Sequence, residues 1–289
     1  MMRIIVPASS ANLGPGFDSI GVAVNRYLIM TVGEETDRWQ VDHDLPNIPH
    51  DERNMIVQAA IKTSPTPLVP HRLTVVSNIP LSHGLGSSSS ANVAGVELAN
   101  QLNQLNLTDE QKVQAAARLE GHPDNVAPAI MGGIVVGTSV DEQFYAVKAP
   151  EPPYALAAYI PRYNLATADS RAALPATMLY PRATHASAIA NTLVAALFAR
   201  NYPVVGKMME ADQFHEPYRA QLVPELHTIR RLSHRCGALA TYLSGAGPTV
   251  MTLIPHNGTD LFSRTLRLHG LTAPLWQLAI DDQGVRVEE

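Results

Sequence analysis

The amino-acid sequence predicts an α+β protein built from two domains. Short segments rich in β-branched and large apolar residues alternate with segments of helical periodicity along the 289 residues. Hydrophobic residues make up 46% of the chain and charged residues 16%, proportions typical of folded proteins. Pro150, Pro152 and Pro153 interrupt the alternation near the middle of the chain. We therefore expect an N-terminal domain over residues 1–150 and a C-terminal domain over residues 151–289.

Four segments of the first half are typical of strands. Residues 3–9 (RIIVPAS) and 27–35 (YLIMTVGEE) are short, apolar and followed by turn-forming residues. Residues 72–80 (RLTVVSNIP) alternate polar and apolar side chains, as a strand with one buried face does. Residues 132–140 (GGIVVGTSV) contain a continuous apolar run, which predicts a buried strand.

Two helices are expected between the third and fourth of these strands. From Ala91 onward, apolar residues fall at a helical spacing, at positions 91, 94, 98, 102 and 105. A second helix is expected within residues 106–121. Thr108 is a suitable N-cap with Gln111 three residues later, which is the pattern of a capping box, and Gly121 follows the last turn.

The second half also combines helices and strands. It begins with a predicted strand at residues 154–161 (YALAAYIP). The later elements that we expect are helices at residues 183–201, 224–237 and 259–269, two strands flanking residues 243–249, and a last strand at residues 275–280. Neither half contains an internal repeat or an extended low-complexity segment.

Composition and charge exclude several classes of protein. The net charge is −5 and no tract of basic residues is present, so nucleic-acid binding has no electrostatic support. Cys236 is the only cysteine, which rules out an intrachain disulfide and disfavours a metal site built from cysteines. The first residues hold no apolar stretch long enough for a signal peptide, and no run approaches the roughly 20 apolar residues of a membrane span. We expect a cytoplasmic protein without membrane contact.

One segment, residues 83–95 (HGLGSSSSANVAG), places Gly84, Gly86 and four serines directly before a predicted helix. The first turn of a helix offers free N–H groups and the positive end of the helix dipole, so it binds anions. Glycines let the backbone fold closely around a phosphate. The lysine of a P-loop is missing, because no lysine lies between Lys62 and Lys112. Taken alone, the segment also fits a flexible turn with a serine N-cap.

Two further segments rich in small residues favour phosphate binding over a simple turn. Residues 7–24 (PASSANLGPGFDSIGVAV) overlap the end of the first predicted strand and continue beyond it. Residues 243–249 (LSGAGPT) lie between two strands near the C-terminus. Three such segments in one chain of this length are difficult to explain as coincidence.

Together these segments resemble the signatures of the GHMP kinases, the small-molecule kinases named for galactose, homoserine, mevalonate and phosphomevalonate. Residues 7–24 resemble the homoserine kinase version of the first signature. Mevalonate kinases and galactokinases instead carry Gly-Lys or Gly-Arg followed by Gly-Glu-His there. Residues 120–133 (EGHPDNVAPAIMGG) and 216–225 (EPYRAQLVPE) also resemble homoserine kinase segments, so the likeness covers nearly the whole chain.

The resemblance implies a two-domain GHMP kinase fold, with a ribosomal protein S5-like N-terminal domain, a ferredoxin-like C-terminal domain and the ATP site between them. The residues that it places around ATP are Asn54, Pro80, Leu81, Ser82, His83, Gly84, Leu85, Gly86, Ser87, Ser88, Ser89 and Ser90. Asn54 would lie near the adenine base, although it also suits the N-cap of a helix. Ser88 and Glu120 would hold Mg²⁺, which prefers oxygen ligands. The alternative for Glu120 is a carboxylate on a helix surface.

The resemblance also implies a site for L-homoserine, which carries both an ammonium and a carboxylate group. The residues expected to bind it are Asn12, Asp18, His122, Asn125, Arg171 and Arg219. The two arginines would bind the carboxylate, Asp18 the ammonium group, and Asn12 would hydrogen-bond the substrate. The residues expected to serve the transfer itself are Asn12, Asp18, Asn125 and Arg171. Whether Asp124 or another group acts as a general base stays open.

The function so indicated is transfer of the γ-phosphate of ATP to the hydroxyl of L-homoserine, on the route to threonine. Two other functions stay open: a kinase of the same superfamily that acts on another small alcohol, and a catalytically silent small-molecule-binding protein of the same fold. The expected partners are ATP, Mg²⁺ and L-homoserine, with neither nucleic acid nor membrane. The sequence leaves the oligomeric state open, and a homodimer is one candidate.

Overall fold

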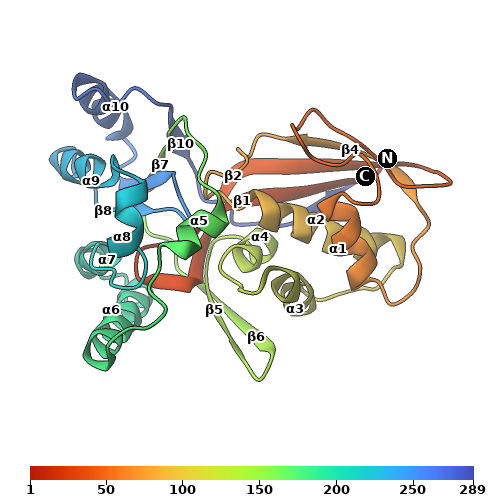
Figure 1. Cartoon of the computed structure of the whole chain (residues 1–289), viewed down its shortest axis with the longest axis horizontal. Helices are drawn as coiled ribbons and strands as arrows, with labels where there is room; N and C mark the ends of the chain where they lie inside the picture. Colours follow the sequence, from red (N-terminus) through yellow and green to blue (C-terminus); the bar gives the residue numbers. More distant parts are fainter.

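The computed structural model describes all 289 residues and consists of two α+β bodies side by side (Figure 1). The first body is built on a seven-stranded sheet and the second on a four-stranded sheet. The strands of the first sheet are β1 (Arg3–Asn12), β2 (Gly16–Glu35), β3 (Gln40–Asp42), β4 (His71–Ser77), β5 (Ile134–Val140), β6 (Gln143–Ala149) and β11 (Arg286–Glu288). The predicted α+β fold class is confirmed.

Strand β2 is the longest element of the first sheet and pairs with three other strands. Residues 20–22 pair with β5, and residues 28–32 pair with β4. Strand β1 runs antiparallel to β2, with shifts of register after Pro7 and Ala11. Proline has no N–H to donate to the sheet, which accounts for the first shift. The far end of this hairpin reaches the second body, where the Gly245 N–H donates to the Ala11 carbonyl at 3.1 Å.

Four helices cover one face of the first sheet (Figure 1). They are α1 (Met55–Thr63), α2 (Ser87–Leu102), α3 (Asp109–Glu120) and α4 (Val126–Met131). Helix α3 confirms the predicted capping box, because the Thr108 hydroxyl accepts from the Gln111 N–H at 3.3 Å and the Gln111 side chain accepts from the Thr108 N–H at 2.9 Å. Gly121 ends this helix with a φ of +95°, a conformation that favours glycine.

Helix α2 begins earlier than the apolar spacing predicts. Its first turn is formed by residues 87–90, and its N-cap is Gly86, with a φ of +68°. The four serines of this turn carry no apolar periodicity, so the pattern in the sequence starts only at Ala91. Strand β6 lies where no element was expected, whereas α1 starts directly after Asn54, the suggested helix N-cap.

The second body follows a linker that contains Pro150, Pro152 and Pro153 and joins β6 to β7. Its strands are β7 (Ala155–Tyr159), β8 (Ala240–Leu243), β9 (Val250–Ile254) and β10 (Leu275–Leu278), antiparallel in the order β10-β7-β9-β8. With helices between β7 and β8 and between β9 and β10, this order is the ferredoxin-like arrangement.

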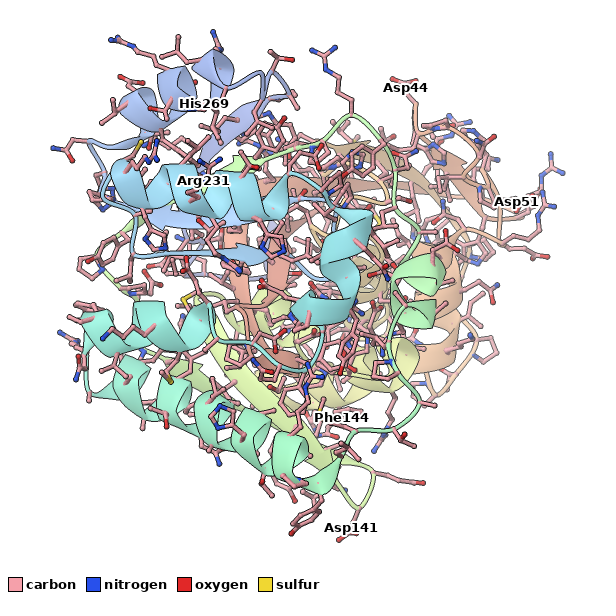
Figure 2. The ribbon with its side chains drawn as sticks, turned by 60° about the vertical axis from the view of Figure 1, so that its left-hand side comes forward. Asp44, Asp51, Asp141, Phe144, Arg231 and His269 are labelled. Atoms are coloured by element: carbon pink, nitrogen blue, oxygen red, sulfur yellow. The ribbon has the colours of Figure 1, made fainter.

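The helices of the second body are α5 (Thr167–Ala172), α6 (Tyr180–Phe198), α7 (Tyr202–Met209), α8 (Glu216–Arg219), α9 (Leu226–Arg235) and α10 (Thr259–Leu268). Figure 2 shows α9 and α10, marked by Arg231 and His269, lying side by side, and α6 and α7 form a second pair. Helix α8 leads into a short 3-10 helix over residues 220–222.

The chain returns to the first body at its C-terminal end. The Asp281 N–H donates to the Ala23 carbonyl at 3.0 Å, and β11 then pairs antiparallel with β1 on the side opposite β2. The two chain termini consequently lie close together (Figure 1). Among the helices, none has the length and apolar character that a bilayer span requires.

Candidate active site

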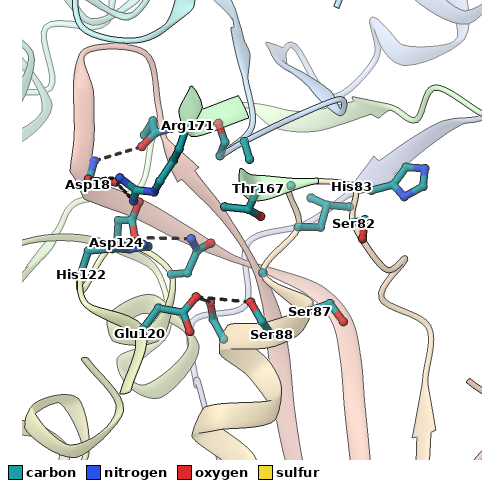
Figure 3. Close-up of a pocket in the computed structure, with 18 of the residues that line it drawn as sticks. Asp18, Ser82, His83, Ser87, Ser88, Glu120, His122, Asp124, Thr167 and Arg171 are labelled. Atoms are coloured by element: carbon teal, nitrogen blue, oxygen red, sulfur yellow. Dashed lines mark hydrogen bonds and ion pairs between the residues drawn. The ribbon is translucent and has the colours of Figure 1, made fainter. Parts of the chain in front are cut away.

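A cavity of about 240 Å³ lies at the junction of the two bodies (Figure 3). At one end, which we call the phosphate end, it is lined by residues 83–89, the phosphate loop, together with Glu120. At the other, the acceptor end, it is lined by the β1–β2 hairpin and by Arg171 and Arg219 of the second body. Residues from both bodies therefore meet around one space, which we take as the candidate active site.

The N-terminus of helix α2 opens into the phosphate end of the cavity. No side chain caps this helix, and its first intrahelical hydrogen bond runs from the Ser90 N–H to the Gly86 carbonyl at 2.8 Å. The N–H groups of Ser87, Ser88 and Ser89 are therefore free to bind an anion.

The two glycines of the phosphate loop are required by contacts with the protein itself. Gly84 and Gly86 have φ angles of +70° and +68°, which glycine adopts without strain. A Cβ on Gly84 would collide with the carbonyl oxygen of Ser244, and one on Gly86 would collide with the hydroxyl of Ser9. Close approach to a phosphate was the expected reason for these glycines. The structure shows that protein atoms occupy the positions where the Cβ atoms would lie.

Glu120, the last residue of α3, faces the first turn of α2 (Figure 3). Its Oε1 accepts hydrogen bonds from the hydroxyls of Ser89 at 2.8 Å and Ser88 at 3.4 Å. Its Oε2 accepts from Asn92 Nδ2 at 2.7 Å. The structure thus brings together Ser88 and Glu120, the two residues expected to hold a metal, and their oxygen atoms are the type of ligand that Mg²⁺ prefers.

Asp18 and Arg171 form a bidentate ion pair across the acceptor end. Arg171 Nη2 lies 2.9 Å from Asp18 Oδ1, and Nη1 lies 3.2 Å from Oδ2. Asp18 belongs to β2 of the first body and Arg171 to α5 of the second (Figure 3). Their side chains are 33% and 42% exposed, so a solute can reach both charges. The residues expected to bind the ammonium and the carboxylate of one amino acid are therefore paired with each other.

Arg219 is buried, in contrast to Arg171. Its Nε donates to the Ser170 carbonyl at 3.2 Å and its Nη1 to the Gly245 carbonyl at 3.1 Å. Its Nη2 has no partner within the protein. Burial and the nearby positive charge of Arg171 lower the pKa of Arg219 to about 10, so it is still charged at neutral pH. The two N–H groups on Nη2 of a fixed guanidinium are thus available to a ligand.

Phe17 lies between the charged groups of the acceptor end. The guanidinium carbons of Arg219 and Arg171 lie 5.1 and 5.7 Å from the centre of its ring, and the ring of His215 stacks on it at 5.5 Å. Cation–π contact of this kind is favourable and helps to orient both arginines. His215 Nε2 donates to the Gly14 carbonyl at 2.9 Å, so its Nδ1 is the acceptor that faces Arg219 Nη1 at 3.4 Å.

His122 extends the set of charges at the acceptor end. Its Nδ1 is hydrogen-bonded to Oδ1 of Asp124, which is 3% exposed. Burial alone would lower the pKa of His122, but the hydrogen bond to Asp124 and the negative charges of Asp124, Asp18 and Glu120 together raise it. These acidic neighbours therefore stabilise the imidazolium form of His122.

Two asparagines line the cavity with their side chains partly engaged. Asn125 Oδ1 accepts from the Ser9 hydroxyl at 2.9 Å. Asn12 has a φ of +77°, its Oδ1 accepts from the Asp18 N–H at 3.2 Å, and its Nδ2 donates to the Gly245 carbonyl at 3.2 Å. Because the amide of Asn12 has two N–H groups, one is left for a ligand.

A second cavity, of about 790 Å³, adjoins the first and shares Ser87 and Ser88 with it. Its lining is more apolar and includes Leu81. Asn54 lies on its wall as the N-cap of α1, where its side chain accepts from the Ile56 N–H at 3.0 Å. The helix-cap alternative for Asn54 is therefore observed, at a position that still borders the cavity.

Two residues expected at the ATP site have mainly structural contacts. Ser90 lines neither cavity, and its buried hydroxyl lies 3.0 and 2.9 Å from the carbonyl oxygens of Pro7 and Gly86. His83 borders both cavities, but its ring nitrogens lie 2.6 and 3.1 Å from the carbonyl oxygens of Leu81 and Pro161. The remaining residues of the expected set line one cavity or both.

Comparison with known proteins agrees with this geometry. Two family models match the chain, the GHMP kinases N terminal domain over residues 54–133 and the GHMP kinases C terminal domain over residues 193–264. A homoserine kinase from Limosilactobacillus fermentum is 59% identical over 286 residues, which cover 99% of this chain and 100% of the relative. A homoserine kinase from Lactobacillus acidophilus is 58% identical, with 100% of both chains covered. The chain belongs to the homoserine kinase family of the GHMP kinases.

A solved homoserine kinase structure from Listeria monocytogenes has a TM-score of 0.88 to this GHMP kinase, at 43% identity and with 100% of both chains covered. The expected family, fold and activity class are therefore confirmed, and the chain is an ATP-dependent kinase.

Several residues that shape the site of this GHMP kinase were missed by sequence reasoning. Phe17 carries a signal in hindsight, because it is the one large aromatic side chain in a segment of small residues. Ser9 and Gly245 lie in the segments at residues 7–24 and 243–249, but no local signal distinguishes them from their neighbours there, and His215 lies outside these segments. Each of the three acts through a contact with a segment far away in the chain, so neither spacing nor composition marks its role.

Proposed function

We propose that this GHMP kinase transfers the γ-phosphoryl group of ATP to the side-chain hydroxyl of L-homoserine and forms O-phospho-L-homoserine, a step toward threonine. The observation that carries the proposal is the division of one cavity into two ends. Free N–H groups and Glu120 line the phosphate end, while charges suited to a zwitterion, on Asp18, Arg171 and Arg219, line the acceptor end. The homoserine kinases named above support the same acceptor.

We assign ATP to the two adjoining cavities. The triphosphate is placed at the first turn of α2, and the adenine in the larger and more apolar cavity beside Asn54. Ser88 and Glu120 supply oxygen ligands that fit Mg²⁺. When bound there, the ion neutralises part of the negative charge on the phosphates.

The acceptor is assigned to the charges at the other end of the cavity. Arg171 and Arg219 are assigned to its carboxylate, and Asp18 to its ammonium group. A zwitterion that enters between Asp18 and Arg171 supplies a new partner for each of them, so that no charge is left unpaired. A ligand with only one of the two charges would leave one residue of the pair without a partner.

In the proposed transfer, the homoserine hydroxyl oxygen forms a bond to the γ-phosphorus of ATP. The bond between that phosphorus and the β–γ bridging oxygen breaks, ADP leaves, and the hydroxyl proton is released. We assign Asn12 and Asn125 to hold the hydroxyl, and His122, whose acidic neighbours stabilise its imidazolium form, lines the same cavity. Phosphoryl transfer depends mainly on positioning and charge stabilisation, so the proposal requires no strong base.

A coupled assay of ADP release tests this function. The purified protein is given ATP and Mg²⁺ with L-homoserine, mevalonate, galactose or no acceptor. We expect ADP release that depends on homoserine and exceeds that with the other two alcohols. Faster release with mevalonate or galactose would assign another small alcohol. Nucleotide binding without release for any acceptor would indicate a silent binding protein.

We further propose that the enzyme works in the cytoplasm, where ATP is available and the single buried Cys236 stays reduced. A homodimer is the assembly that we propose to test. Light scattering at several protein concentrations would distinguish it from a monomer.

A further inference from the structure

A chain of buried hydroxyl groups connects the second body to the phosphate loop. The Tyr242 hydroxyl, on β8, lies 2.9 Å from the Ser10 hydroxyl on β1, which lies 2.7 Å from the Ser244 hydroxyl. The Ser244 hydroxyl lies 2.6 Å from the carbonyl oxygen of Gly84. The three hydroxyl-bearing residues are each 0% exposed, and none of them lines either cavity.

The direction of donation along this chain is fixed by its last member. A carbonyl oxygen only accepts, so the Ser244 hydroxyl donates its single proton to Gly84. Ser244 must then accept from Ser10, and Ser10 must accept from Tyr242. Each donation polarises the next hydroxyl, so the bonds strengthen one another. Burial raises the pKa of Tyr242, which keeps its phenol protonated as the first donor.

The chain of hydroxyl groups fixes the peptide group between Gly84 and Leu85, and a separate contact fixes the peptide group between Leu85 and Gly86. The Gly84 carbonyl is held by Ser244, and the Leu85 carbonyl accepts from the Ser9 N–H at 3.2 Å. In a trans peptide the C=O and the following N–H point in opposite directions. The two anchors therefore turn the N–H groups of Leu85 and Gly86 away from the protein. Neither N–H has a partner within the protein, and both residues line the cavity.

We propose that Tyr242, Ser10 and Ser244 are positioning residues that hold the phosphate loop in its anion-binding conformation. Glycine at position 84 permits many backbone conformations, so the loop depends on an external anchor. Tyr242 and Ser244 belong to the second body, whereas Ser10 and Gly84 belong to the first. The relative placement of the bodies is thereby coupled to nucleotide binding. The inference rests on the proposed function, because the anion is taken to be the triphosphate of ATP.

The test is the affinity of folded, full-length variants for the non-hydrolysable analogue AMP-PNP with Mg²⁺, measured by calorimetry. We expect losses that decrease with distance from Gly84. Affinity should fall about tenfold in Ser244→Ala, about fivefold in Ser10→Ala and about twofold in Tyr242→Phe, since one lost hydrogen bond is worth about a factor of ten. The unfolding midpoint without nucleotide is measured in parallel, because purely structural damage would change that midpoint without producing this order.

Tyr159→Phe is the matched control. Tyr159 is buried on β7 of the same sheet, and its hydroxyl accepts from the Ala273 N–H at 3.4 Å without a link to the loop. We expect this variant to keep wild-type affinity. Equal losses in the Tyr159 and Tyr242 variants, or no loss in Ser244→Ala, would overturn the proposal. If Ser244→Ala does not fold, the two tyrosine variants decide.

The wild-type measurement separates this inference from the proposed function. A wild-type protein that does not bind the analogue would overturn both. A wild-type protein that binds it, with variants that bind equally well, would overturn the inference alone.

Discussion

The two ends of the active-site cavity recognise their ligands by different means. The phosphate end offers backbone N–H groups, hydroxyls and the carboxylate of Glu120, and no lysine lines the cavity. The acceptor end holds five titratable residues, Asp18, His122, Asp124, Arg171 and Arg219. Recognition at the phosphate end thus depends on main-chain conformation and on the anchors that fix it. Recognition at the acceptor end depends on charges that can be removed one at a time.

The largest effect is expected from the single charge at the phosphate end. Glu120→Gln should lower kcat about 100-fold or more, because it removes the charge that would hold the metal. Homoserine affinity should change little, since Glu120 contacts α2 and not the acceptor residues. Steady-state kinetics across a Mg²⁺ titration measures both quantities. Wild-type turnover throughout the titration would show that Glu120 is a surface carboxylate.

Removal of one acceptor-end charge should have the next largest effect. Arg219→Leu should lower kcat/KM for homoserine 10- to 200-fold, or roughly 1.5–3 kcal/mol, through loss of a charge-assisted hydrogen bond. The control is a second substrate, 3-aminopropan-1-ol, which lacks the carboxylate and should lose little. Equal losses for the two substrates would contradict the assignment of Arg219 to the carboxylate.

A substitution that removes no functional group should still weaken ATP binding at the phosphate end. Gly86→Ala places a Cβ against the Ser9 hydroxyl, and it should weaken ATP binding about tenfold as the loop shifts. Gly270→Ala is the matched control, because Gly270 has a φ of +79° and no atom lies within 4 Å of the position that its Cβ would occupy. The positive φ should cost each variant roughly 1 kcal/mol of stability, and the collision with Ser9 adds to this cost in Gly86→Ala alone. Wild-type affinity in Gly86→Ala would mean that loop conformation matters less than we infer.

Breaking the Asp18–Arg171 ion pair should have a smaller effect, and it should raise the affinity for one ligand instead of lowering it. The ligand 4-hydroxybutanoate is homoserine without its ammonium group. Asp18→Asn should raise the affinity for it about threefold, because Arg171 then binds the carboxylate without first breaking its partly exposed ion pair with Asp18. Homoserine affinity should fall in the same variant. Glu120→Gln removes a negative charge from the same cavity without touching Arg171. Equal gains for 4-hydroxybutanoate in both variants would assign the effect to overall charge. Competition binding measures these affinities.

The smallest effect concerns the pH dependence of stability. The pKa of His122 is raised in the folded state, so its contribution to stability is fully present below the unfolded-state pKa of about 6.5. That contribution is lost as the pH rises through the folded-state pKa. The difference in unfolding free energy between wild type and His122→Asn should therefore shrink as the pH rises above about 6.5. Urea unfolding measures it, and a difference that grows with pH would contradict the assignment.

The elements that were predictable from the sequence have local signals. The capping box at Thr108 and Gln111 and the glycine at position 121 define α3 within a dozen residues. Strand β6 has no such signal. Its exposed face carries the apolar residues Tyr145 and Val147, each 57% exposed, so polar and apolar residues do not alternate along its sequence. Its place is set by pairing with β5 and contact with α3.

The candidate site shows the same limit. Asp18, His122 and Arg219 were predicted because they lie in segments that resemble those of a known family. Their arrangement was not, since Asp18 and Arg171 are 153 positions apart and Ser9 and Asn125 are 116 apart. Contacts over such separations depend on how two sheets and their helices pack, which no single segment specifies.

The return of β11 to β1 has a consequence for the synthesis of the protein. Arg3 pairs with Glu288 in the sheet, and their side chains form an ion pair at 3.2 Å. Residues 3–5 of β1 therefore lack their partner on this side until residues 286–288 have been synthesised. Unpaired strand edges can pair with other chains. During translation, this end of β1 is thus completed only after both bodies have been synthesised.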